Sequence, residues 1–260
     1  MSPSDADLQG YLDALVARYE RRAFIAEDPI ALPHAFDAPE DQEVIGLWAA
    51  LLAWGRRSVL LKKLSELVER MGHRPHRFVR DFRPAHADRL AGFKHRTFQP
   101  ADAVGLTLAM QAALDAYGSL GRLFAAHLPP DAPHIGPALQ GFSDTLLTVG
   151  PGAPRTKHLA RPSTGSACKR LAMYARWMVR PGPVDLGLWP DVSPALLVLP
   201  LDVHTSRQAR RLGLLRRRQD DWRAVLELTE HLRRLSPDDP ARYDFALFGL
   251  GAYGGEALDA

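Results

Sequence analysis

Apolar residues recur at the spacing of an α-helix along almost the whole chain, and no segment shows sustained alternation of apolar and polar residues. Residues 41–55 are apolar almost all round, which is typical of a helix buried in a core. In residues 5–22, five side chains share one helical face: Leu8, Leu12, Leu15, Val16 and Tyr19. Because an apolar fraction of 46% can fill a proper core, we predict an all-α fold.

Proline, glycine and aspartate mark the ends of the other predicted helices. Pro100 stands in the first turn of a helix that ends near Gly118, and Gly72 ends an earlier helix. Further helices are expected over residues 58–72, 119–128, 135–149, 165–180, 202–213, 220–235 and 239–255. The last two begin with aspartate in the N-cap position. Residues 181–201 hold five prolines and cannot form one helix, and their end is either a short strand or a buried extended connector.

Cysteine content and hydropathy exclude several classes of protein. The single cysteine, Cys168, excludes a disulfide framework, a four-cysteine zinc site and a four-cysteine iron–sulfur cluster, and it fits a reducing cytosol. The first ten residues are acidic and polar, unlike a signal peptide. No apolar run reaches the roughly 18–20 residues that cross a bilayer. We expect a cytoplasmic monomer without membrane contact, cofactor or metal.

Charge is distributed unevenly along the chain, although the net charge is only +3. Residues 1–50 carry three arginines against ten acidic residues. Residues 145–184 carry seven basic residues and residues 205–218 carry six, and neither segment holds an acid. Two such segments indicate a polyanionic partner such as nucleic acid. A bias toward arginine, which outnumbers lysine 28 to 5, explains the choice of arginine but not the missing acids.

A Gly- and Pro-rich stretch, residues 150–165, leads into an amphipathic helix that carries Lys169 near its start. A helix N-terminus offers unpaired N–H groups and the positive end of the helix dipole, which suit an anion. We therefore predict contacts with the phosphates of DNA for the residues of this region: Arg155, Lys157, Arg161, Gly165, Ser166 and Arg170. One interpretation of Lys169 is a further phosphate contact of the same kind.

The other interpretation makes Lys169 a nucleophile and requires a carboxylate. An amine attacks only when deprotonated, and a free lysine with a pKa of about 10.4 is protonated at neutral pH. Burial and neighbouring cations lower that pKa, and a carboxylate can accept the proton. Asp202 follows an apolar run and opens a basic helix, 33 residues after Lys169. A plain N-cap is the alternative role for Asp202.

Three segments, taken in order, resemble the helix-hairpin-helix DNA glycosylase superfamily, which includes endonuclease III and the 8-oxoguanine glycosylases. They are GSACKRLAMY at 165–174, LPLDVHTSRQARRLG at 199–213 and YDFALFGLGAYGG at 243–255. Residues 44–79 resemble the first barrel helices of that superfamily. The interval between Lys169 and Asp202 is nearest to the archaeal 8-oxoguanine glycosylase branch, and the chain as a whole is similar to an uncharacterised bacterial family within the superfamily.

This resemblance implies a base-excision glycosylase with AP lyase activity, acting on 8-oxoguanine in double-stranded DNA in the nucleoid. Lys169 would attack the sugar C1′ and Asp202 would activate it. His204 would contact DNA, or else be a capping or surface residue. The implied base pocket consists of Trp54, Asp244 and Phe248. Core packing is the alternative for the two aromatic residues, and helix capping is the alternative for the acid.

The resemblance also implies two helical lobes with a cleft between them. Residues 40–170 would form a central bundle that ends in the hairpin, and residues 1–39 would join residues 185–260 in the second lobe. The sequence departs from the superfamily in its degenerate hairpin, residues 162–166, and in lacking a cysteine cluster after the last helix. Two other classes remain open: a non-catalytic DNA-binding protein on the same fold, and a metal-dependent enzyme, for which no H-E-x-x-H pair is present.

Overall fold

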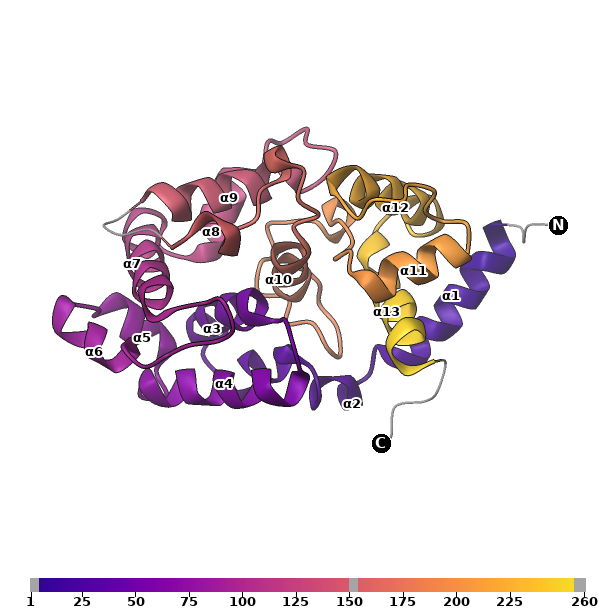
Figure 1. The fold of residues 1–260 in the computed structure, drawn as a ribbon. Helices are drawn as coiled ribbons and strands as arrows, with labels where there is room; N and C mark the ends of the chain where they lie inside the picture. Colours follow the sequence, from indigo (N-terminus) through magenta and orange to yellow (C-terminus); the bar gives the residue numbers. More distant parts are fainter. Residues whose placement is uncertain (1–4, 150–153, 255–260) are drawn as a thin grey trace. The chain divides into compact units, whose positions relative to one another are not determined.

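The computed structural model describes residues 5–149 and 154–254. These residues form α-helices and short 3-10 helices and contain no strand, which confirms the all-α prediction for the described part of the chain (Figure 1). Residues 150–153 of the predicted Gly- and Pro-rich stretch lie outside the described residues. Among the described helices, none combines the length and the apolar character that crossing a membrane requires.

The chain divides into two compact units. Unit 1 comprises Met1–Glu27, Asp131–Gly136 and Pro162–Ala260, and unit 2 comprises Asp28–Pro130 and Pro137–Arg161. This division assigns residues 162–170 to the same unit as the C-terminal third of the chain, whereas the sequence-based division ended the central bundle at residue 170. A backbone contact explains the assignment, because the amide of Trp222 donates a hydrogen bond to the carbonyl of Gly165.

Unit 2 is built around one apolar helix, α3, which contacts α4, α5 and α8. Trp48 on α3 is fully buried and packs edge-on against Phe93 and Phe98. The helices of this unit are η1 (Pro29–Ala31), η2 (Pro33–Ala35), α3 (Pro39–Leu52), α4 (Arg57–Arg70), α5 (Pro75–Arg80), η3 (Pro84–His86), α6 (Ala87–Leu90), α7 (Pro100–Tyr117), α8 (Leu120–Ala126), α9 (Gly136–Thr148) and η4 (Thr156–His158). The predicted start of α7 at Pro100 and its end at Gly118 are confirmed.

Unit 1 is organised around α13, which packs against both α1 and α11 (Figure 1). Its helices are α1 (Asp5–Tyr19), α2 (Arg22–Ile25), η5 (Pro162–Thr164), α10 (Lys169–Val179), η6 (Pro194–Leu196), α11 (Val203–Arg211), α12 (Trp222–Leu235), η7 (Pro240–Arg242) and α13 (Tyr243–Tyr253). The five residues predicted to form the apolar face of α1 are all buried. A Cβ at Gly249 would overlap the buried ring of Tyr19, and one at Gly251 would lie 2.8 Å from the Cβ of His204. Glycine therefore allows α13 to approach both neighbours closely.

The prediction that α10 is amphipathic is wrong, because every residue from Leu171 to Val179 is buried. This stretch includes Arg176, and the adjacent Arg180 is buried as well. Both guanidinium groups lie against the ring of Phe245, at 4.3 and 5.5 Å from its centroid. These two arginines of the acid-free segment therefore do not form a DNA-facing surface.

Carboxylates from distant parts of unit 1 balance these two arginines. Arg176 pairs with Asp244 and, at 3.3 Å, with Asp185. Arg180 pairs with Asp185, with Glu20 at 2.9 Å and with Asp239 at 2.9 Å. Asp239 was predicted to cap the last helix, but its side chain makes no capping hydrogen bond because it binds Arg180. The residues described therefore hold a buried ionic network where the sequence indicates unbalanced positive charge.

Candidate active site

Lys169 is the first residue of α10 and follows a tightly turned segment of unit 1. In this segment, Gly165 with φ of 78° and Cys168 with φ of 50° both have left-handed backbone conformations. The amide of Cys168 donates to the hydroxyl of Ser166 at 3.2 Å, which stabilises the turn. Burial raises the pKa of the Cys168 thiol to about 12, so this thiol is protonated at neutral pH. The turn fixes the point at which Lys169 leaves the backbone.

Asp202 is the N-cap of α11, as the sequence predicts, and only one of its carboxylate oxygens makes the cap. Its Oδ1 accepts hydrogen bonds from the amides of His204 at 2.8 Å and Thr205 at 2.9 Å. These bonds hold the carboxylate in one orientation at the helix N-terminus. The second oxygen, Oδ2, is thereby directed away from the cap.

The structure brings Lys169 and Asp202 together within unit 1. The Nζ of Lys169 lies 3.6 Å from the Oδ2 of Asp202, which is the oxygen that the cap does not use. The side chains are 31% and 17% exposed, so an amine and a carboxylate face each other at a site that a substrate can reach. An amine that can pass its proton to an adjacent carboxylate has the arrangement of an activated nucleophile.

A buried acid lies behind this pair. Asp244, on α13, pairs with Arg176 and accepts a hydrogen bond from the Thr205 hydroxyl at 3.3 Å. Burial raises the pKa of Asp244 to about 6, and the charge of Asp202 adds to this effect, while Arg176 and Lys169 oppose it. Asp244 therefore senses the charges of both candidate catalytic residues.

Two further predicted residues of unit 1 join α11 to α13. His204 donates from Nδ1 to the carbonyl of Gly251 at 3.0 Å, and its ring meets that of Phe248 edge-on at 5.9 Å between centroids. Phe248 is half-buried and also contacts Phe24 and Tyr253. The predicted roles of His204 in DNA binding and of Phe248 in a base pocket stay predictions.

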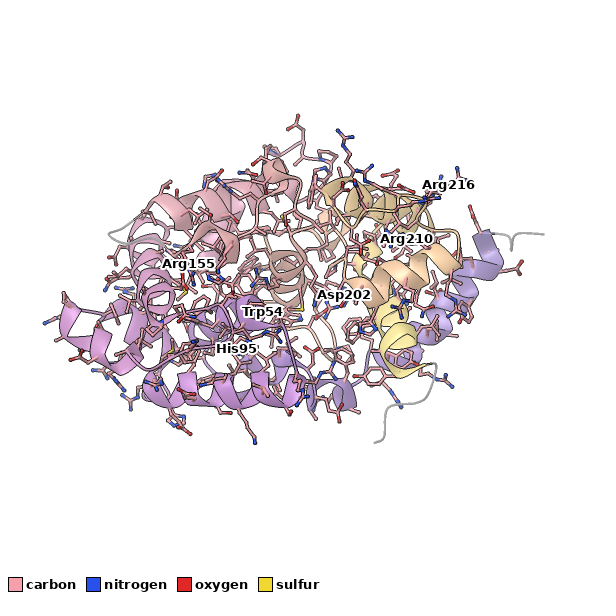
Figure 2. All side chains as sticks on the ribbon, viewed as in Figure 1. Trp54, His95, Arg155, Asp202, Arg210 and Arg216 are labelled. Atoms are coloured by element: carbon pink, nitrogen blue, oxygen red, sulfur yellow. The ribbon has the colours of Figure 1, made fainter. Side chains whose placement is uncertain are left out.

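Trp54 belongs to unit 2 and stands two residues after the end of α3, and Figure 2 labels it with His95. Its ring is half-buried, and the Arg96 guanidinium lies 5.2 Å from its centroid. His95 donates to the carbonyl of Trp54 at 3.1 Å, and burial lowers the pKa of this histidine. Trp54 therefore belongs to an aromatic and cationic cluster of its own unit, and its predicted contact with a damaged base stays a prediction.

The predicted phosphate contacts are divided between the units. Gly165, Ser166 and Arg170 lie in unit 1, and the other three, Arg155, Lys157 and Arg161, lie in unit 2. Arg155 binds the buried carboxylate of Asp102 and the carbonyl of Thr97, and Arg161 pairs with Asp144 at 3.3 Å.

Asp102 and Arg170 illustrate two opposite effects on ionisation. Burial raises the pKa of Asp102, but the hydrogen bonds from Arg155 and from the amide of Gln99 outweigh it and hold that pKa well below its usual range. Arg170 is half-buried, and burial lowers its pKa. Half of the Arg155 side chain remains exposed, and the roles of these residues in DNA binding stay predictions.

Sequence reasoning missed Thr205 and Arg176 as supports of the candidate site. Thr205 is fully buried and connects the helix opened by Asp202 to Asp244. The sequence does carry a signal for the second residue, since Arg176 and Arg180 stand four residues apart in a stretch, residues 171–180, that has no other charged residue. Buried arginines in such a helix require acidic partners.

Comparison with protein families identifies one match, over residues 28–253, to the family described as "Protein of unknown function (DUF2400)". The chain belongs to this family. The match includes both Lys169 and Asp202. Searches of the curated proteins and of the solved structures found no match.

Proposed function

We propose that this protein is a base-excision DNA glycosylase with AP lyase activity, built on the two-lobed helix-hairpin-helix glycosylase fold. Its substrate would be double-stranded DNA that contains a damaged base, with 8-oxoguanine as the first candidate, and it would act at the nucleoid. One observation carries the proposal: the amine of Lys169 lies 3.6 Å from the carboxylate oxygen of Asp202 that makes no cap. The order of the three resembling segments agrees with it.

In the proposed reaction, Asp202 accepts a proton from the Lys169 ammonium through Oδ2. The neutral amine then attacks C1′ of the damaged nucleotide, and the bond between C1′ and the base breaks. The base departs with the bonding electrons and takes up a proton. The nearby carboxylate stabilises the positive charge that develops on the sugar.

The lyase step follows from the covalent intermediate. The bond between C1′ and O4′ then breaks, and the proton that remains on nitrogen passes to O4′, which gives a Schiff base between C1′ and Lys169. Removal of a proton from C2′ then expels the 3′ phosphate oxygen and cuts the strand. The target nucleotide must first leave the helix, at a cost of a few kcal/mol in lost stacking, which DNA contacts elsewhere on the protein would offset.

Borohydride trapping tests this proposal, because hydride reduces the Schiff base to a stable amine and leaves the protein joined to DNA. The substrates are duplexes with 8-oxoguanine, uracil, an oxidised pyrimidine or an abasic site. We expect the wild-type protein to form an adduct, the Lys169→Gln variant to form none, and the control variant Lys62→Gln, at an exposed lysine of α4, to behave as wild type. A folded wild-type protein that binds DNA and forms no adduct on any duplex would instead be a non-catalytic DNA-binding protein.

A further inference from the structure

Helix α11 carries an exposed stripe that begins directly after Asp202. Val203, Arg207 and Arg211 are all exposed and stand four residues apart, so they share one face of the helix. Val203 has 57% of its surface exposed, although it is a large apolar residue. The opposite face, which includes Thr205, is buried. The stripe is therefore the solvent-facing side of the helix that Asp202 opens.

Two arginines, Arg210 on α11 and Arg217 on the loop after it, are engaged by neighbouring groups. Arg210 donates to the carbonyls of Arg217 and Arg218, at 2.7 and 3.0 Å, and pairs with Asp220. Arg217 pairs with Asp221, which caps α12. These interactions hold the loop in one shape, and they leave Arg210 and Arg217 paired with acids.

Arg216 and Arg218, on either side of Arg217, are exposed, and Figure 2 labels Arg216 on this loop. We call the four exposed residues the arginine track: Arg207, Arg211, Arg216 and Arg218.

No residue of the arginine track forms an ion pair with a described residue, because the neighbouring acids are already engaged. Asp220 binds Arg210 and the hydroxyl of Ser206, and Asp221 binds Arg217. Glu227 accepts the backbone amide of Arg216 at 2.6 Å. Arg211 donates one hydrogen bond to the side-chain oxygen of Gln208 at 3.3 Å. Exposed arginines without acidic partners keep donors for an anion, and the guanidinium fork fits a phosphate bidentately.

The track also connects the two elements of the candidate site. Its first member stands five residues after Asp202, about 7.5 Å along the helix, and its last helical member about 13.5 Å along. Successive phosphates of one DNA strand advance by about 3.4 Å along the duplex axis. At its far end, the loop leads to Trp222, whose amide binds the carbonyl of Gly165 in the hairpin. The track thus extends from the candidate catalytic aspartate back to the hairpin.

We propose that the arginine track is a second phosphate-binding surface, which binds the DNA backbone a few nucleotides from the target base. The choice of DNA as the partner of the arginine track rests on the proposed function. The sequence indicates a polyanionic partner for residues 205–218 as a whole, and the structure separates the four exposed arginines of the track from Arg210 and Arg217, which are paired with acids. The track would hold the strand while the hairpin holds the duplex beside Lys169.

The test compares two double variants that remove the same charge. Arg207→Ala with Arg216→Ala removes one residue from each half of the track. Arg22→Ala with Arg234→Ala is the matched control, because both residues are exposed arginines of unit 1 that form no ion pair with a described residue. Thermal unfolding establishes that both variants fold. Binding to a duplex with an abasic-site analogue is measured at several salt concentrations.

We expect the track variant to bind about tenfold or more weakly near 0.1 M salt, and the slope of log affinity against log salt to fall in magnitude by about 2. The control should stay within about twofold of wild type. Equal binding by the two variants overturns the inference, as does a wild-type protein that binds an acidic polypeptide but not DNA.

Trapping with borohydride at saturating DNA separates this inference from the proposed function. A wild-type adduct whose yield the track variant retains, together with the weaker and less salt-dependent binding of that variant, supports both. An adduct without any binding defect in the track variant overturns the track alone. Loss of affinity and salt dependence in the track variant, without an adduct from wild type, overturns the glycosylase activity and supports the track.

Discussion

The Nζ of Lys169 and the Oδ2 of Asp202 lie 3.6 Å apart, and each residue stands at the start of a helix of unit 1. The two oxygens of Asp202 have different partners, since Oδ1 binds the amides of His204 and Thr205. The structural and chemical roles of Asp202 can therefore be separated by a substitution that preserves the helix cap and removes the group that accepts the lysine proton.

Asp202→Asn is that substitution. Asparagine caps a helix about as well as aspartate, so the variant should fold with nearly unchanged stability. It cannot accept the lysine proton, and the single-turnover rate of strand cleavage should fall roughly 10²- to 10⁴-fold. Asp221→Asn, at the N-cap of α12, is the matched control and should cleave at the wild-type rate. Cleavage by Asp202→Asn at that rate would show that the carboxylate has no chemical role.

Arg180→Met should destabilise the protein strongly. Arg180 is 3% exposed, and its removal leaves the fully buried carboxylate of Asp185 without one of its partners. Breaking a buried ion pair from one side costs about 3–5 kcal/mol. Arg233→Met, which removes an exposed pair with Glu230, should cost less than about 1 kcal/mol. Urea unfolding measures both, and similar losses in the two variants would contradict a structural role for the buried network.

Asp244→Asn should change how stability depends on pH. Burial raises the pKa of Asp244 to about 6, while an aspartate in the unfolded chain ionises near 3.9. Between these values the native state retains a proton that the unfolded state has lost, so the wild-type free energy of unfolding falls as pH rises from about 4 to about 6, by up to roughly 2–3 kcal/mol. The groups that act on this carboxylate are Arg176, Lys169, Asp202 and Asp185.

The asparagine variant lacks this contribution. The free energy of unfolding of the variant, minus that of wild type, should therefore rise by the same amount as pH increases across that range. Urea unfolding of both proteins at several pH values measures the difference. Stability curves that run parallel from about pH 4 to about pH 7 would contradict the raised pKa.

Gly249→Ala tests the close packing of α13 on α1. The added Cβ would overlap the Tyr19 ring, which is fully buried and cannot move aside. Overpacking of this kind costs about 1–3 kcal/mol. Gly10→Ala is the control, because nothing lies within 4 Å of the position that its Cβ would take on α1, and it should stabilise the protein by about 0.5–1 kcal/mol. Equal stability of the two variants in thermal unfolding would contradict the packing described.

Helices could be predicted from the sequence wherever the pattern is local. The five buried residues of α1 follow helical periodicity, and Pro100 and Gly118 mark the ends of α7 because backbone geometry restricts these residue types. The capping role of Asp202 is local in the same sense, since its side chain binds amides two and three residues ahead.

Pairings between distant residues could not be predicted in this way. Arg176 and Arg180 stand in a segment without acids, and their partners come from Glu20, Asp185, Asp239 and Asp244. Only the fold brings these carboxylates to α10, and so the charge of the segment indicated an exposed surface where the structure has a buried network. In the same way, the sequence alone does not distinguish Arg217, which pairs with Asp221, from its exposed neighbours in the arginine track.

The most direct test of the account is to locate the covalent bond formed with DNA. The wild-type protein is incubated with an abasic-site duplex and borohydride, digested with a protease, and the peptide that carries the nucleotide remnant is sequenced by mass spectrometry. We predict the modification on Nζ of Lys169, and its absence in the Asp202→Asn variant over the same reaction time. A modification on any other amine, with Lys169 unmodified, would contradict it.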